Sequence, residues 1–211
     1  MRREPVGAVG LITAWNFPLM GAIWKTGAAL AAGNVCVLKP AEQTPLTALA
    51  LADLAAPILP PGVLNVITGQ GDPVGSALSQ HPKIRMVSVT GAVATGKAVA
   101  AAAAHTLKRV HLELGGNCPA IVFGDADLDA VVAGIRHAAT VNSGQVCLSA
   151  SRLLVAKSCY DDFLDRLVPA FESVQVGAPE EGEHIEMGRS PIAGTATGLS
   201  TTSTAPRTRR S

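Results

Sequence analysis

Aromatic side chains are scarce in this chain, which has one tyrosine, two tryptophans and four phenylalanines among 211 residues. So few rings argue against a stacking platform for single-stranded nucleic acid, where bases stack on aromatic side chains. Excess charge of either sign is also absent, since the chain has 17 lysines and arginines and 16 aspartates and glutamates. The net charge of +1 gives no electrostatic reason to expect nucleic acid or a strongly acidic partner.

Cysteine pairs, a secretory leader and membrane-length apolar runs are missing as well. The four cysteines are Cys36, Cys118, Cys147 and Cys159. They form no CxxC pair and no Cys/His cluster with metal-ligand spacing, so we expect no metal site. Scattered thiols are typical of a reducing compartment. With no leader and no apolar run long enough to span a membrane, the sequence predicts a cytoplasmic protein without a membrane partner.

Strand-like and helix-like segments alternate regularly from residue 6 to residue 187. Short apolar runs predict strands at residues 6–15, 34–40, 63–68, 84–90, 109–114, 120–123 and 152–157. Helices are predicted at residues 18–33, 44–58, 72–81, 95–107, 127–141 and 159–174. This alternation predicts an α/β fold, a parallel sheet with helices on both faces. Ligands of such sheets bind beyond the carboxyl ends of the strands.

The end of the chain has a different composition. Residues 188–211 contain six threonines, four serines and four arginines but no acidic or aromatic residue. Such a segment has too little apolar surface to offset the entropy of ordering, so we predict a disordered tail. The abrupt change at Gly188 also fits translation out of frame, with a genuine, divergent C-terminus as the alternative.

Four segments near predicted strand ends carry side chains suited to catalysis or cofactor binding. Asn16 offers an amide that can donate to a developing oxyanion. Lys39 and Glu42 supply a cation and a carboxylate suited to phosphates and ribose hydroxyls. Glu113 supplies a carboxylate base, and Cys147 follows a small polar segment. A thiol nucleophile, an oxyanion donor and a base together make a covalent acyl-transfer set.

Each of these side chains also has an ordinary structural interpretation. Asn16 stands before a Phe-Pro pair, a setting typical of a turn. Lys39 by itself is more typical of a solvated charge, and Glu113 of a turn carboxylate. A single cysteine in an apolar chain is usually a buried, inert thiol. The functional interpretation therefore depends on the order of these residues along the chain.

Five stretches resemble motifs of the aldehyde dehydrogenase superfamily in order and spacing. They are ITAWNFPL, AGNVCVLKPAEQTPLTAL, MVSVTGAVATGK, LELGGNCPAIVFGDADLD and NSGQVC, and the resemblance covers about residues 3–187. The stretch GQGDPVGSALSQHPKIRMVSVTGAVATG is most similar to the aminobutyraldehyde and betaine-aldehyde branch. The resemblance implies an oxidoreductase that converts an aldehyde to the carboxylic acid with NAD, or alternatively NADP.

The resemblance also implies a role for each matched position. Cys147 would attack the aldehyde carbon as thiolate, with Asn16 and the backbone N–H of Cys147 holding the oxyanion. Glu113 would activate the water that hydrolyses the resulting thioester. Lys39 and Glu42 would bind the adenosine ribose, where a carboxylate favours NAD over NADP.

Further cofactor contacts are implied at Trp15, Gly69, Gly91, Ala92 and Leu114. Gly91 and Ala92 would open the helix whose N-terminus faces the pyrophosphate. Family members usually have serine at the position of Ala92, so the backbone must replace one phosphate hydrogen bond. Asn117 replaces a common lysine.

The resemblance divides the chain into a cofactor-binding domain at residues 1–114, the beginning of an α/β catalytic domain at 115–187, and the tail. Family chains are more than twice as long, so the first domain is expected to be truncated N-terminally and the second C-terminally. A full-length form would be a homo-oligomer acting on a small-molecule aldehyde.

Two other functions are compatible with parts of the sequence. The stretch GAVATGKA at 91–98 matches a P-loop, GxxxxGK[ST], except that Ala98 replaces the hydroxyl residue. That change would remove a Mg²⁺ ligand. The other possibility is a catalytically inactive chain that keeps the cofactor-binding fold and exposes apolar surface.

Overall fold

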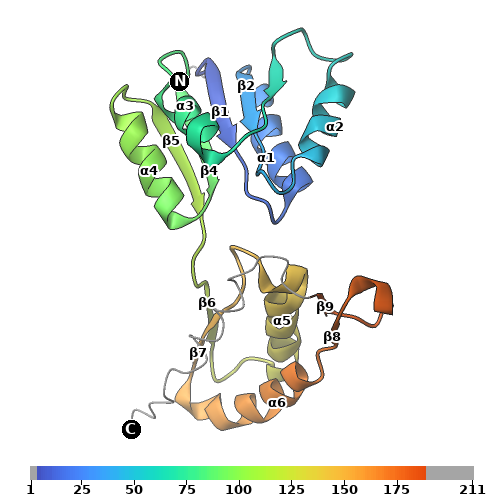
Figure 1. Ribbon diagram of the computed structural model, residues 1–211. Coiled ribbons are helices and arrows are strands. Elements are labelled where there is room, and N and C mark those ends of the chain that lie inside the picture. Colours follow the sequence, from blue (N-terminus) through green and yellow to red (C-terminus); the bar gives the residue numbers. More distant parts are fainter. Residues whose placement is uncertain (1–3, 189–211) are drawn as a thin grey trace. The chain divides into compact units, whose positions relative to one another are not determined.

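The computed structural model describes residues 4–188, which form two compact units (Figure 1). The first unit ends at Gly116 and the second begins at Asn117, whereas the sequence places the boundary after residue 114. Gly188, expected to open the tail, ends the last strand instead. The remaining residues of the expected tail, 189–211, lie outside the described residues.

The first unit is built on a five-stranded sheet in the order β3-β2-β1-β4-β5. Its strands are β1 (Ala8–Ile12), β2 (Val35–Lys39), β3 (Leu64–Val66), β4 (Met86–Gly91) and β5 (Arg109–Leu114). Every neighbouring pair is parallel. The chain runs outward from β1 to β3 and then returns to build β4 and β5 on the other side of β1. All five carboxyl ends therefore lie at one edge of the sheet.

Helices cover both faces of this sheet, as the sequence predicts. They are α1 (Pro18–Ala31), α2 (Leu46–Ala55), α3 (Ser76–Gln80), which follows the π-helical turn η1 (Gly71–Gly75), and α4 (Val93–Ala104). Right-handed crossovers that run in opposite directions from β1 place α1 and α2 on one face, and α3 and α4 on the other (Figure 1). The α/β fold with a parallel sheet is thus confirmed.

Two apolar layers hold these helices to the sheet. Leu11 and Leu38 pack towards α1 and α2, and Val87 and Val89 pack towards α3 and α4. Neighbouring residues of a strand point to opposite faces, so a strand covered on both sides must be apolar at nearly every position. The sequence AVGLI of β1 meets this requirement, and β1 is the central strand.

The second unit contains two two-stranded parallel sheets within its described residues. Its elements are β6 (Pro119–Val122), α5 (Leu128–Thr140), η2 (Val141–Gly144), β7 (Arg152–Val155), η3 (Lys157–Cys159), α6 (Tyr160–Glu172), β8 (Val176–Gly177), η4 (Pro179–Glu181) and β9 (Met187–Gly188). α5 and α6 pack over the β6–β7 pair around Phe163, which is fully buried. The β8–β9 pair is not predicted, because its strands of 2 residues are too short for periodicity.

We expect Asp127→Ala to lower the free energy of unfolding by about 1 kcal/mol, the usual effect of losing a helix N-cap. The Asp127 carboxylate accepts hydrogen bonds from the backbone N–H groups of Asp129 and Ala130 at the start of α5. Urea denaturation followed by far-UV circular dichroism measures the change. Asp125→Ala is the matched control and should have little effect, and an equal loss in both variants would contradict the capping role.

Candidate functional site

The loops at the carboxyl edge of the first unit carry several predicted site residues. Trp15 and Asn16 lie in the bend that follows β1, and Lys39 is the last residue of β2. Two hydrogen bonds tie these loops together. The N–H of Thr13 donates to the carbonyl of Lys39 at 3.1 Å, and the hydroxyl of Thr44 donates to the carbonyl of Trp15 at 3.1 Å. The bend is compatible with the turn interpretation of Asn16 as well as with an amide that faces a ligand.

Lys39 is buried, with 2% of its surface exposed, so its interpretation as a solvated charge is wrong. Its ammonium donates to the Glu42 carboxylate at 3.1 Å and to the Pro40 carbonyl at 3.0 Å. Such partners are what a buried charge requires. Partial burial acts to raise the pKa of Glu42, but hydrogen bonds from its own backbone amide and from Lys39 outweigh burial and lower that pKa. Glu42 is therefore an exposed, ionised carboxylate at neutral pH.

Gly69, just after β3, allows the chain to turn tightly into η1. Its φ is +145°, and a Cβ there would lie 2.5 Å from Cγ2 of Val74. A side chain at this position is therefore excluded by both conformation and space. The backbone of Gly75 at the end of η1 comes close to Lys39, since an added Cβ would lie 3.8 Å from the Lys39 Cδ. η1 therefore packs against the Lys39 side chain.

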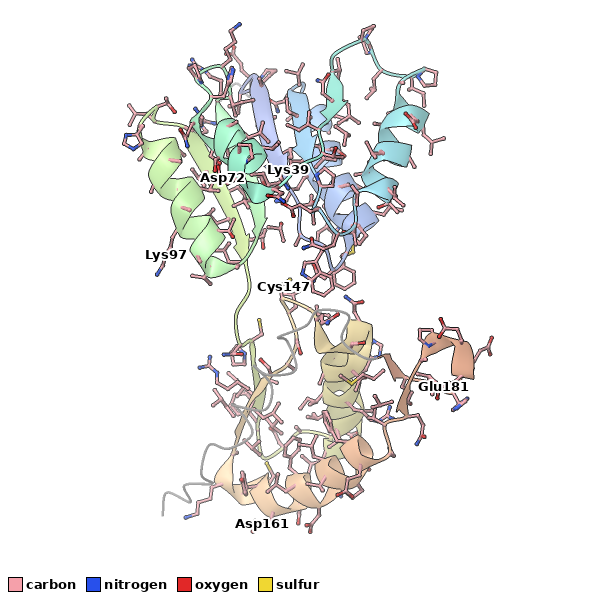
Figure 2. All side chains as sticks on the ribbon, viewed as in Figure 1. Lys39, Asp72, Lys97, Cys147, Asp161 and Glu181 are labelled. Carbon is pink, nitrogen blue, oxygen red and sulfur yellow. The ribbon has the colours of Figure 1, made fainter. Side chains whose placement is uncertain are left out.

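Gly91 ends β4 and Ala92 is the N-cap of α4, so the expectation that Gly91 opens the helix is corrected. No side chain caps α4. Its first-turn N–H groups and the small residues before it fit the pyrophosphate of a dinucleotide. Because Ala92 alone separates strand from helix, this segment has no loop to cradle a triphosphate. Lys97 points outward from α4 (Figure 2), and the P-loop interpretation is not supported.

Glu113 lies within β5, so its interpretation as a turn carboxylate is wrong. The next residue, Leu114, packs against α4, where a Cβ at Gly96 would come 2.7 Å from the Leu114 Cδ1. Side chains alternate along a strand, so Glu113 points to the opposite face of the sheet, the face of α1. There its Oε1 lies 3.1 Å from Nε2 of His111.

A chain of polar contacts that the sequence analysis does not identify leads away from Glu113. The β4–β5 register pairs Ser88 with His111, and Ser88 Oγ lies 2.9 Å from His111 Nδ1. The Lys25 ammonium, from α1, donates to Ser88 Oγ at 2.6 Å. The available sequence signal is the His-x-Glu spacing of β5, which puts both side chains on one face. The partners Ser88 and Lys25 come from the tertiary structure.

Cys147 belongs to the second unit, in the loop between η2 and β7 (Figure 2). Three consecutive residues before this loop have positive φ: Asn142 at 51°, Ser143 at 57° and Gly144 at 73°. Left-handed backbone is unfavourable for serine and is often found at functional loops. A turn then follows, closed by the Ser149 N–H donating to the Val146 carbonyl at 3.1 Å. This turn places Cys147 at its second position.

The four thiols differ in accessibility. Cys36 is buried in the first unit, and burial raises its pKa to about 11, which makes it a poor nucleophile at neutral pH. Cys159 is buried in the core of the second unit. Cys118 and Cys147 are half-buried, and the Cys118 thiol donates to the Cys147 carbonyl at 3.3 Å. The interpretation of Cys147 as a buried thiol is thus not supported, since its side chain is partly accessible.

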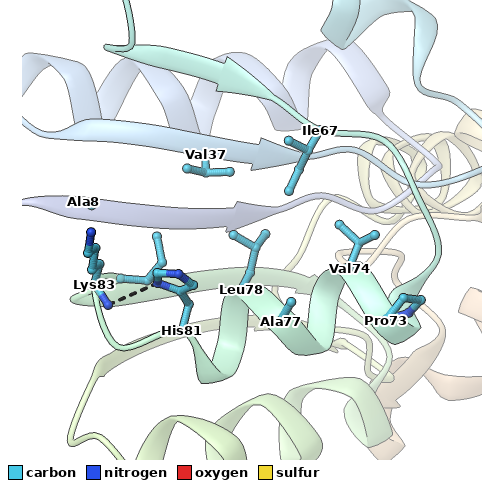
Figure 3. Close-up of a pocket in the computed structure, with 10 residues that line it drawn as sticks. Ala8, Val37, Ile67, Pro73, Val74, Ala77, Leu78, His81 and Lys83 are labelled. Atoms are coloured by element: carbon cyan, nitrogen blue, oxygen red, sulfur yellow. Dashed lines mark hydrogen bonds between the residues drawn. The ribbon is translucent and has the colours of Figure 1, made fainter.

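A separate apolar pocket of about 540 Å³ lies between α3 and strands β1 to β3 (Figure 3). Its lining includes Val37, Ile67, Val74 and Leu78, with His81 at one end. The predicted site residues are not among its lining residues. Apart from His81 and Lys83 the lining is apolar, with no thiol, hydroxyl or carboxylate side chain, so the pocket is not a candidate reaction site.

Two other kinds of feature are absent from residues 4–188. No group of three or more histidine, cysteine, aspartate or glutamate side chains in that range could hold a metal ion. Nor does any described helix combine the length and apolarity needed to cross a membrane.

We expect Lys25 to contribute stability that increases as the pH rises above about 8. Burial lowers the pKa of Lys25 from 10.5 to about 8, an effect that the Glu113 carboxylate partly opposes. Between those values the unfolded state binds more protons at this site than the folded state, so folding gains stability as the pH increases. Urea denaturation at neutral pH and near pH 9 should show a smaller rise for Lys25→Met than for the parent. Lys97→Met, on the exposed face of α4, should keep the full rise, and an unchanged rise in Lys25→Met would contradict the assignment.

Comparison with known proteins identifies the family to which these features belong. The model of the aldehyde dehydrogenase family matches residues 1–193. The phenylacetaldehyde dehydrogenase of Pseudomonas fluorescens is 49% identical over 186 residues, which cover 87% of this chain and 37% of that protein. The mitochondrial succinate-semialdehyde dehydrogenase of Arabidopsis thaliana is 51% identical over 176 residues, covering 83% and 33% of the two chains. Relatives named for different substrates thus match almost equally well.

The fold is shared with solved members of the family. The crystal structure of an NAD-dependent aldehyde dehydrogenase from Sinorhizobium meliloti superposes with a TM-score of 0.90 at 44% identity, over 96% of this chain and 40% of that one. The chain spans about a third of the length of the curated relatives it matches, 37% and 33% in the two cases above. Its sequence motifs, its parallel sheet and the family match agree, and the chain belongs to the aldehyde dehydrogenase family.

Proposed function

We propose that this chain serves the oxidation of an aldehyde to its carboxylic acid, with Cys147 as the nucleophile and NAD as the cofactor. The observation that carries the proposal is the position of Cys147 on a turn, half-buried, behind a run of left-handed residues. The family match supplies the type of reaction. Asn16 and Glu113 lie in the first unit and Cys147 in the second, so the family resemblance is what assigns them to one reaction.

In the proposed mechanism the Cys147 thiolate forms a C–S bond with the aldehyde carbon. The Asn16 amide and the Cys147 N–H donate hydrogen bonds to the oxyanion. Bound nicotinamide would supply the hydride acceptor. Glu113 then takes a proton from water, whose oxygen adds to the thioester carbon on Cys147. The C–S bond breaks, the acid leaves, and the thiolate of Cys147 is restored.

The residues at the carboxyl edge of the first unit suit a dinucleotide. The exposed Glu42 carboxylate can accept hydrogen bonds from two ribose hydroxyls, and the same charge would repel a 2′-phosphate. The Lys39 ammonium donates a hydrogen bond to Glu42 and so holds this carboxylate in place. The uncapped N-terminus of α4 and the adjacent Gly91 would receive the pyrophosphate. Solved neighbours include an enzyme named as NAD-dependent and another, from Escherichia coli, named as NADP-dependent, so the choice of NAD depends on the Glu42 carboxylate.

One observation favours a second candidate, a chain that keeps the cofactor-binding fold without turnover. Large apolar side chains on and after α2 are strongly exposed, among them Leu46 at 76% and Ile58 at 79%. Exposed apolar surface of this kind marks an interface or an aggregation liability. The aminobutyraldehyde or betaine-aldehyde substrate branch, a homo-oligomeric full-length form and a cytoplasmic location stay predictions of the sequence.

We expect the chain, mixed with NAD and a short aliphatic aldehyde, to produce NADH and a transient acyl adduct on the Cys147 peptide. Cys147→Ser removes the sulfur nucleophile and should abolish both signals. Glu113→Gln leaves the nucleophile but removes the base, so the adduct should accumulate. Absorbance of NADH and mass spectrometry of the quenched, digested protein measure the two signals.

Cys118→Ser is the matched control, because Cys118 is the other half-buried thiol and contacts the same loop. It should retain both the adduct and the NADH signal. An adduct that persists in Cys147→Ser would exclude Cys147 as the nucleophile. Binding of NAD without any NADH or adduct in the parent would favour the inactive candidate.

Glu42→Gln should weaken the preference for NAD over NADP by roughly tenfold or more, since like charges in contact cost several kcal/mol. The lowered pKa of Glu42 means that its charge is present at neutral pH. Isothermal titration calorimetry with each dinucleotide gives the ratio of the two affinities. Asp53→Asn on the exposed surface of α2 serves as a charge-matched control. A ratio that Glu42→Gln leaves unchanged would remove Glu42 from the cofactor site.

A further inference from the structure

Three contacts connect Lys25 to Glu113 through Ser88 and His111, and donors and acceptors can be assigned so that each contact is a hydrogen bond. Lys25 can only donate while it is protonated, so Ser88 Oγ accepts from it. The Ser88 hydroxyl is then free to donate to Nδ1 of His111. A neutral imidazole that accepts at Nδ1 carries its proton on Nε2, which donates to the Glu113 carboxylate. One tautomer of His111 therefore satisfies all three contacts.

The sheet itself produces this arrangement. Ser88 and His111 are direct partners in the β4–β5 register. His111 and Glu113 are two positions apart on β5 and share a face. Ser88 is buried under α1, which brings Lys25 within reach, whereas the His111 and Glu113 side chains are 52% and 60% exposed. Packing therefore fixes Lys25 and Ser88, whereas the position of Glu113 depends on its contact with the His111 imidazole.

We propose that His111 is a positioning residue that holds the Glu113 carboxylate and links it through Ser88 to Lys25. This inference deepens the proposed function, because it rests on Glu113 being the base of that reaction. Glu113 extends from a strand with more than half of its side chain exposed, and its partner among the described contacts is His111. A base must be held within hydrogen-bonding reach of the water that it activates.

A neutral imidazole can hold the Glu113 carboxylate without the direct contact to an ammonium that would weaken it as a base. An ammonium in contact with a carboxylate favours the ionised form and makes the carboxylate a weaker base. Here Ser88 and His111 stand between the Lys25 ammonium and the Glu113 carboxylate, so the carboxylate is held by a neutral donor and not by the ammonium. The titratable and charged groups that face His111 are Lys25 of α1, Glu113 of β5 and, by strand alternation, Arg109 of β5.

Two measurements on the full chain test the proposal. Long-range ¹⁵N–¹H correlation spectra assign the tautomer of each histidine without any turnover. We expect the neutral form of His111 to carry its proton on Nε2, and Ser88→Ala to reduce that preference. A parent His111 with the proton on Nδ1 would overturn the proposal, because Nε2 could then not donate to Glu113.

The second measurement follows hydrolysis of the Cys147 thioester after a single turnover. In His111→Gln we expect formation of the thioester to be unchanged and hydrolysis to slow roughly 10- to 100-fold, the usual effect of a misplaced group. The acid limb of the pH profile should move to higher pH, because the ionised carboxylate loses a hydrogen bond. His105→Gln, at the exposed end of α4, is the matched control and should change neither.

The two readouts separate this inference from the proposed function. A His111→Gln variant with normal hydrolysis and an unmoved pH profile overturns the positioning role while the dehydrogenase mechanism stands. A parent chain that forms no thioester on Cys147 overturns the proposed function instead. In that case the tautomer of His111 still tests whether Lys25, Ser88, His111 and Glu113 form the hydrogen-bonded series.

Discussion

The parallel pairing of β1 with both β2 and β4 is the constraint on which the rest of the first unit depends. Parallel strands need a crossover connection, and right-handed crossovers in opposite directions from β1 cover both faces with helices. The same pairing brings all five carboxyl ends to one edge. Lys39, Gly69 and Gly91 are distant in sequence and share this edge only because their strands are in register. Any site built there is a consequence of sheet topology.

Much of this could be predicted because each segment carries its own signal. The apolar run of β1 and the Pro at the start of α1 identify their elements locally. The position of reactive groups near strand ends follows from the general rule for parallel sheets. Burial of Lys39 could not be predicted, since a lysine is normally solvated and the approach of η1 to its side chain is a tertiary contact. The left-handed residues before Cys147 and the β8–β9 pair also depend on contacts that a local pattern does not encode.

The contrast between Lys39 and Lys25 shows how burial of the same side chain can serve different ends. Lys39 contacts a carboxylate directly, and that contact keeps Glu42 charged and fixed beside the edge of the sheet. Lys25 reaches a neutral hydroxyl, and the cost of burying its charge appears as a lowered pKa of about 8. Direct contact with the Lys39 ammonium suits Glu42, whose proposed role requires a charged, fixed carboxylate. The Lys25 ammonium instead contacts Ser88, and two side chains lie between it and the candidate base Glu113.

Side chains alternate along β5, so this strand contributes both to the apolar packing against α4 and to the polar contacts on the opposite face of the sheet. Leu112 and Leu114 lie on the face towards α4, and Leu114 fills the space that Gly96 leaves open. His111 and Glu113 occupy the other face and make the polar contacts. A shift of the β4–β5 register by one residue would exchange the two faces, burying Glu113 against α4 and exposing Leu114. The packing of Leu114 against Gly96 therefore also fixes which residue of β5 faces Ser88, and so determines where the candidate base can lie.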